Sequence, residues 1–129
     1  MSVKAIAMPI CELCDRLTIA QLKYERLPDD ELDKQGLRKQ IAYYWSGVDP
    51  RNIPLQNLIV DLREINGQIW DAEWAIRKGL DDRLGLEEVG RRAIVVRDLN
   101  RQRVALKNQI TSLVNQDEFA DCKMNHVSG

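Results

Sequence analysis

Helix-breaking residues are scarce in this sequence, and no run of apolar residues is long enough to cross a membrane. Only four prolines occur among the 129 residues, at positions 9, 28, 50 and 54. No segment approaches the roughly 20 consecutive apolar residues that a transmembrane helix needs. Residues 1–9 also lack the long apolar core of a signal peptide. We therefore expect a cytoplasmic protein, of a cell or of a virus-infected host, that has no membrane contact.

An excess of charge of either sign is missing as well. The chain has 20 acidic and 19 basic residues, which gives a net charge of -1. This balance provides no overall attraction to nucleic acid or to anionic lipid. Three cysteines are an odd number, and a protein without an export signal keeps its thiols reduced. A single domain over residues 1–129 can bury about two-thirds of its unfolded surface, so it needs neither a disulfide nor a metal to fold.

Apolar residues recur three and four positions apart through most of the chain, with no strand-like alternation. This spacing places them on one face of a helix and predicts an all-α fold. Proline ends helices because it lacks an N–H and disfavours helix in the residue before it. With the prolines as boundaries, the pattern predicts four main helices between an N-terminal arm at 1–9 and a flexible tail at 116–129. The predicted helices cover residues 10–27, 29–45, 54–78 and 86–114.

The last two predicted helices are long enough to form an antiparallel helical hairpin. Apolar residues in its first arm alternate three and four apart without a break, which favours coiled-coil-like packing, and Asn52 can cap the start of this arm. At 1.5 Å per residue the arm is about 38 Å long. Because one small chain leaves the ends of such an arm poorly covered, we expect a homodimer that completes a helical bundle. The apolar positions of the arm are Leu55, Leu58, Leu62, Ile65, Ile69, Ala72 and Ile76.

Polar residues interrupt the apolar pattern in both arms. Those of the first arm share one helix face, because spacings of three and four recur on one side, and those of the second surround its apolar seam. Buried polar residues in such a seam commonly fix helix register and partner, here through a pair between Glu73 and an arginine and a network of asparagines. The same residues could instead line a ligand-binding cleft. The candidates are Asn66, Trp70, Glu73 and Arg77 in the first arm, and Arg97, Asp98, Asn100, Arg101 and Asn108 in the second.

The last predicted helix is rich in basic residues. A functional interpretation is a stripe that binds phosphate or nucleic acid. A structural interpretation is pairing with the acids of the opposite arm, at positions 61, 64, 71 and 73. No aromatic residues are interleaved for base stacking, so we favour the pairing and expect no nucleic-acid partner. The basic residues are Arg91, Arg92, Arg97, Arg101, Arg103 and Lys107.

Cysteine and histidine form two short motifs with metal-binding spacing. Cys11-x-x-Cys14 and Cys122-x-x-x-His126 have the form of zinc half-sites, since zinc prefers thiolate and imidazole ligands. Cys11 and Cys14 lie on an amphipathic helix, however, where such a pair often belongs to the core. Pairs of acids three residues apart, which could hold Mg²⁺, are no more frequent than chance. We therefore expect no metal and no cofactor, with zinc as the alternative.

Three phrases of the sequence resemble those of a known family. They are ELCDRLTI at 12–19, the pattern Asn66-x-x-x-Trp70-Asp71-x-Glu73-x-x-x-Arg77, and a run over 90–110 that contains RDLNR. In these phrases the chain is similar to a family of small, uncharacterised all-helical proteins that occur in phages and near bacterial surface-polysaccharide genes. The resemblance implies an all-helical fold and a cluster joining the Trp, Glu and Arg of one arm to the Asn and Arg of the other. It implies no activity, and the family pattern does not require a cysteine at position 11 or 14.

These patterns favour a non-catalytic helical assembly protein or small-ligand-binding protein, whose polar residues set specificity or hold a small anionic ligand. The alternative is an enzyme that acts on a phosphorylated or sugar-nucleotide substrate. In that enzyme Glu73 and Asp98 would be the acid/base or metal-binding candidates, and Arg77 and Arg101 would hold the phosphate. No histidine, serine or cysteine is placed with a base in a way that supports a mechanism, so the catalytic residues stay unassigned.

Overall fold

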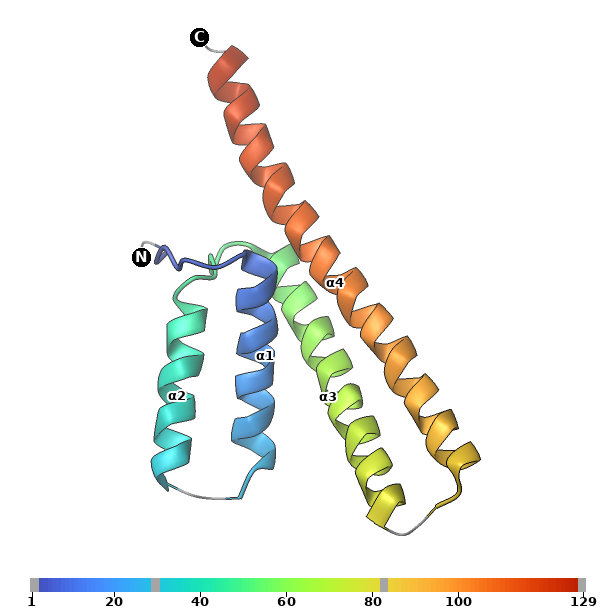
Figure 1. Ribbon diagram of the computed structural model, residues 1–129. Helices are drawn as coiled ribbons and strands as arrows, with labels where there is room; N and C mark the ends of the chain where they lie inside the picture. Colours follow the sequence, from blue (N-terminus) through green and yellow to red (C-terminus); the bar gives the residue numbers. More distant parts are fainter. Residues whose placement is uncertain (1–2, 29–30, 82–83, 128–129) are drawn as a thin grey trace.

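In the computed structural model the chain folds into helices. The structure describes residues 3–28, 31–81 and 84–127; the side chains of 31–32, 80–81 and 116–127 lie outside the description. Within these ranges there are four helices and no strand, which confirms the predicted all-α fold (Figure 1). The helices are α1 (Ile10–Arg26), α2 (Glu31–Trp45), α3 (Ile53–Asp81) and α4 (Leu86–Val127).

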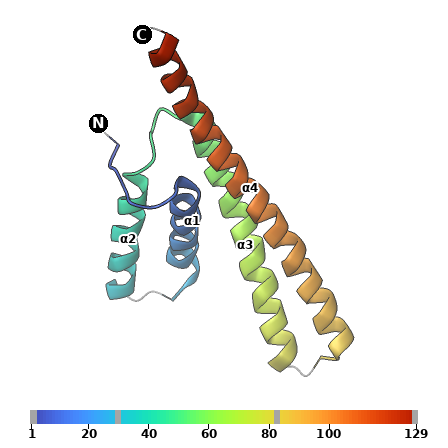
Figure 2. The same cartoon turned by 45° about the horizontal axis from the view of Figure 1, so that its top comes forward.

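The arrangement of the helices gives α1 the central place. Helices α3 and α4 run antiparallel and side by side, and α1 packs against both of them and against α2 (Figures 1 and 2). Among the described helices α2 contacts only α1. Helices α1 and α2 lie beside one half of the α3–α4 pair, so the connecting end of that pair projects beyond them, and α4 projects past every other helix in the opposite direction (Figure 1).

The hydrophobic core lies where α1, α3 and α4 meet. Leu17, Leu62 and Ile110, one from each helix, have no exposed surface. Full burial of a side chain of this size contributes roughly 1.5 to 3 kcal/mol to the stability of the fold, so these contacts hold the three helices together. Helix α1 is buried on more than one face because it lies between α2 and the α3–α4 pair. The other core residues are Leu13, Cys14, Val48, Leu55 and Ile59.

The N-terminal arm and the α2–α3 connection meet at the end of α1. The N–H of Lys4 donates to the carbonyl of Ser46 at 2.8 Å, and Ile6 packs against the core. A Cβ on Gly47 would lie 2.6 Å from Leu13 Cδ1 and 2.8 Å from Ile6 Cδ1. Such distances are far inside van der Waals contact, so the absence of a side chain at Gly47 lets the connection close over the core.

Helix ends follow the local signals in one case and depart from them in another. The Oδ1 of Asn52 accepts a hydrogen bond from the N–H of Leu55 at 3.1 Å, which confirms the predicted cap of α3. Helix α4 continues to Val127, whereas the sequence pattern predicted an end at 114. Residues 115–127 contain no proline or glycine that would stop the helix. The flexibility of the tail stays a prediction.

No helix in the described residues has the length and apolar character needed to cross a membrane.

Candidate functional site

A carboxylate buried in the middle of α1 joins three helices. Asp15 is only 3 % exposed. One of its oxygens accepts hydrogen bonds from Asn66 Nδ2 of α3 and from Arg103 Nε of α4, each at 3.0 Å, and the other accepts a second bond from the same guanidinium. The hydroxyl of Thr18 accepts from Asn66 Nδ2 and donates to the carbonyl of Asp15, both at 2.8 Å. We call Asp15, Thr18, Asn66 and Arg103 the Asp15 cluster.

The Asp15 cluster carries its charges at neutral pH. Burial alone would raise the pKa of Asp15, but the hydrogen bonds from Arg103 and Asn66, with the positive charges of Arg103 and Lys107, lower it below its ordinary value. The hydrogen bond to Asp15 raises the pKa of Arg103 despite the partial burial of that side chain. One turn further along α4, Lys107 Nζ binds Glu12 Oε1 of α1 at 2.5 Å. These two ion pairs fix the register of α4 on α1.

Beside the Asp15 cluster, a cavity of about 390 Å³ opens where α1 ends on the face of α3. All four polar candidates of α3 line this cavity. Helix α1 provides part of its apolar wall, and Arg103 is the contribution of α4. We call this space the α1-end cavity; its lining residues are Ile19, Leu22, Asn66, Ile69, Trp70, Glu73, Arg77 and Arg103.

The end of α1 is anchored next to this cavity. Arg26 Nη1 binds Asp71 Oδ1 at 2.7 Å and the carbonyl of Gly67 at 3.3 Å. Its guanidinium carbon also lies 5.8 Å from the ring centre of Trp70. A cation in this position interacts favourably with an indole ring. The contacts of Arg26 therefore hold the Trp70 ring in place at the rim.

Glu73 and Arg77 are the two exposed charges of the α1-end cavity. The structure records no hydrogen bond or ion pair for either of them among the described residues. The negative charge of Glu73 helps to raise the pKa of Arg103, but the guanidinium of Arg103 is hydrogen-bonded to Asp15 instead. The predicted pair between Glu73 and an arginine is therefore not formed in the described part of the chain.

The polar candidates of α4 lie outside the α1-end cavity. Asp98 Oδ1 is 3.4 Å from Arg97 Nη2 and 3.9 Å from Arg101 Nη1, and each of these three side chains is more than half exposed. Asn100 is half-buried, and Asn108 is exposed. None of the α4 candidates thus lines the α1-end cavity with the candidates of α3. At about 100° per residue, the positions of α4 that turn toward α1 are those of Arg103 and Lys107.

The prediction that the bases of α4 pair with the acids of α3 is wrong: no ion pair of this kind forms among the described residues. The arginines at 91 and 92 pair with Glu87 and Glu88 of their own helix. Those at 97 and 101 pair with Asp98, whereas Arg103 and Lys107 pair with α1. Arg92 reaches α3 only through the carbonyl of Ala75, at 2.6 Å. Acids of α1 therefore bind Arg103 and Lys107, in place of the acids of α3 that the sequence predicted.

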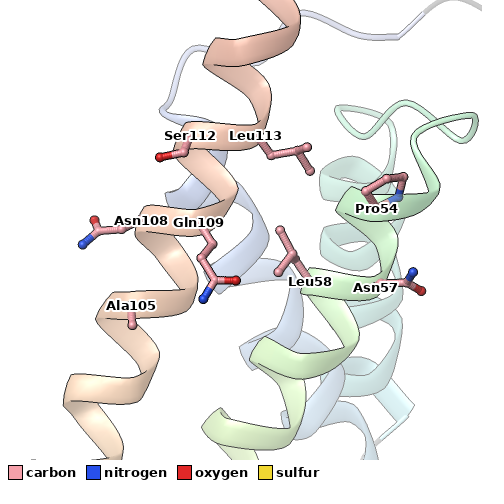
Figure 3. A pocket seen from close by; sticks show the side chains of 8 residues that line it. All are labelled: Pro54, Asn57, Leu58, Ala105, Asn108, Gln109, Ser112 and Leu113. Atoms are coloured by element: carbon pink, nitrogen blue, oxygen red, sulfur yellow. The ribbon is translucent and has the colours of Figure 1, made fainter.

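A second hollow lies on the opposite side of the α3–α4 pair. In Figure 3, α1 is behind the two helices, and the side chains of Leu58 and Leu113 point toward each other across the space between them. This hollow has a volume of about 620 Å³. It continues along the pair into a hollow of about 400 Å³ that shares Ala105 and Gln109. We call both together the outer groove, lined by Pro54, Asn57, Leu58, Asp61, Glu64, Ile65, Gln102, Ala105, Leu106, Asn108, Gln109, Ser112 and Leu113.

The N-terminal cysteines have the environment of core residues. Cys14 has no exposed surface. Burial, together with the charges of Cys11 and Asp15, raises its pKa to about 12, so the thiol stays protonated at neutral pH. No three or more His, Cys, Asp or Glu residues gather as metal ligands among the side chains that the structure describes. The side chains of Cys122 and His126 lie outside the described residues, so the zinc alternative stays an untested prediction.

Comparison with protein-family models, with curated proteins and with solved structures finds no match to this chain. Its function must therefore be inferred from the geometry of the α1-end cavity and of the outer groove.

Proposed function

We propose that this chain is a non-catalytic helical assembly protein of the cytoplasm that associates with a second copy through its outer groove. The support comes from the way α1 is placed. It covers one side of the α3–α4 pair, whereas the other side has an open groove with apolar side chains such as Leu58, Ile65 and Leu113 at its base. A helix from a second copy is the kind of element that fits such a groove, as in helical bundles.

The length of α4 is a second reason for the proposal. Its 42 residues correspond to about 63 Å at 1.5 Å per residue. Its C-terminal part projects past the other helices (Figures 1 and 2). A helical segment without packing partners is only marginally stable in water. A second copy lying along α3 and α4 would extend the packed surface in that direction.

The positions of the polar candidates favour assembly over catalysis. The enzyme hypothesis assigns the acid/base or metal-binding role to Glu73 and Asp98 as a pair. Glu73 lines the α1-end cavity, whereas Asp98 lies in the exposed charge group with Arg97 and Arg101. Acid/base residues act within hydrogen-bond reach of one substrate, and these two acids do not share a cavity. The resemblance to the phage and polysaccharide-gene family is compatible with assembly but supplies no activity.

The test replaces an alanine at the centre of the outer groove. Ala105 lines both parts of the groove, so Ala105→Arg puts a long cation where a second helix would pack. Ala42→Arg on the exposed side of α2 is the matched control. We expect light scattering after gel filtration to give twice the 14.9 kDa chain mass for the native chain and Ala42→Arg, and the single-chain mass for Ala105→Arg. A native chain that stays monomeric at high concentration would refute the proposal.

A further inference from the structure

We propose that the α1-end cavity binds a small zwitterion with an apolar body, namely a free apolar α-amino acid. This inference goes beyond assembly and concerns the other side of the α3–α4 pair. It is based on three features of the cavity: two opposite charges side by side, no net charge among the lining residues once Arg103 is paired with Asp15, and an apolar wall of suitable size.

The two charges are those of Glu73 and Arg77. They are one helical turn apart on the same face of α3, a spacing that places their Cβ atoms about 6 Å from each other. Both are exposed, and no ion pair is recorded for either one in the described part of the chain. A carboxylate can accept hydrogen bonds from an ammonium group, and a guanidinium can bind a carboxylate through two parallel bonds. The ammonium of the ligand would therefore lie against Glu73 and its carboxylate against Arg77.

Three acids near the cavity are paired with bases. Asp15 is paired with Arg103, Glu12 with Lys107, and Asp71 with Arg26. Of the charged residues that line the cavity, Arg103 is paired with Asp15, so Glu73 and Arg77 remain as one acid and one base. A site without net positive charge gives little advantage to a phosphate or another multiply charged anion. The balance thus favours a dipolar ligand over the small anion that the sequence suggested.

The remaining wall is apolar and held in place. Ile19 and Leu22 of α1 line the cavity together with Ile69 and Trp70 of α3. Its volume of about 390 Å³ is near the small end of the roughly 300–1,000 Å³ found for ligand pockets. The floor is fixed, because Asn66 and Arg103 are hydrogen-bonded within the Asp15 cluster. An aliphatic or aromatic side chain would fill this wall while the charged end of the amino acid binds at the rim.

The first experiment is calorimetric titration of the full chain with L-phenylalanine and L-leucine. Two analogues separate the charges: 3-phenylpropionate lacks the ammonium group, and 2-phenylethylamine lacks the carboxylate. We expect one amino acid per chain for at least one of the two, and binding at least tenfold weaker for both analogues and for inorganic phosphate. Absence of saturable binding for both amino acids, or tighter binding of phosphate or of an analogue, would overturn the proposal.

Substitutions locate the site. Glu73→Gln and Arg77→Gln remove one charge each without touching a recorded contact, so the protein should fold as before. Each should weaken amino-acid binding at least tenfold, since a hydrogen bond between two charged groups is lost. Arg101→Gln is the matched control, because its side chain is 72 % exposed and outside the cavity. Equal affinity of Arg77→Gln and Arg101→Gln would refute the assignment. Ala105→Arg should bind the amino acid normally, so the failure of assembly and the failure of this proposal are distinguishable.

Discussion

Replacement of Arg103 by methionine tests whether the Asp15 cluster holds the three helices together. The substitution keeps much of the volume of the arginine stem but removes both hydrogen bonds from the guanidinium to Asp15. The carboxylate, which is 3 % exposed in the native chain, would then keep only Asn66 as a side-chain donor. Removal of one partner from a buried ion pair typically costs about 3 to 5 kcal/mol, because the other charge stays buried and uncompensated.

The expected loss lies at the lower end of that range. The Arg103 side chain is 30 % exposed, so water can reach part of the space that it leaves. We therefore expect the free energy of unfolding to fall by about 3 kcal/mol. For a domain of this size that corresponds to a drop in melting temperature of roughly 10 °C. Urea unfolding followed by circular dichroism measures the first quantity, and a thermal melt measures the second. Arg101→Met, at an exposed position, should change stability by less than about 0.5 kcal/mol.

The dependence on pH gives the same prediction a second test. Because the pKa of Asp15 is lowered in the folded chain, its contribution to stability is complete above the unfolded value near 4 and is lost as the pH falls through the folded value. A neutral Asp15 no longer needs Arg103, so the difference between the native chain and Arg103→Met should narrow as the pH falls below about 4. The double variant Asp15→Leu/Arg103→Met should regain most of the loss. A double variant as unstable as Arg103→Met alone would refute the reasoning.

The core, the buried cysteine and the helix cap allow three further predictions. Leu62→Ala should lower the free energy of unfolding by about 2 to 5 kcal/mol, because the side chain is fully buried. The control Val60→Ala, at a position 66 % exposed, should lower it by less than about 0.5 kcal/mol. Similar losses for both variants in urea unfolding would contradict the burial of Leu62 in the core. Iodoacetamide at pH 8 should label Cys11 before Cys14, because Cys14 is fully buried and its pKa is raised to about 12. Peptide mass spectrometry detects the labelled residues. Rapid labelling of Cys14 in the folded chain would refute its burial. Asn52→Ala should cost about 1 kcal/mol through loss of the cap, and an unchanged urea midpoint would show that the cap does not contribute.

Much of the helical content and one face of the candidate site could be predicted from local patterns. The spacing of Asn66, Trp70, Glu73 and Arg77 places them on one side of a helix whatever that helix packs against, and the structure finds all four around one cavity. The cap by Asn52 is equally local, since it joins residues three positions apart. These features depend on the geometry of a single helix, which the order of the residues determines directly.

The residues that complete the site could not be found in this way. Asp15 and Thr18 lie beside apolar residues of α1, and their burial depends on α1 being enclosed between α2 and the α3–α4 pair. In the sequence Arg103 stands out only as one of the basic residues of the last helix, yet it is the side chain that binds Asp15 across 88 positions of sequence. The only signal in the sequence was an acid within the most apolar part of the first helix, with a base in the seam of the last.

The order of residues in this chain by itself determined where helices form and which residues share a face, because helical periodicity and capping act over three or four positions. Which faces meet was decided only by the tertiary structure. Helix α1 takes the side of α3 and α4 that carries Asn66 and Arg103, because its buried carboxylate can be satisfied there by both. The α1-end cavity and the open outer groove are consequences of that choice, since α1 is too short to cover the whole pair and lies on one side of it (Figure 1).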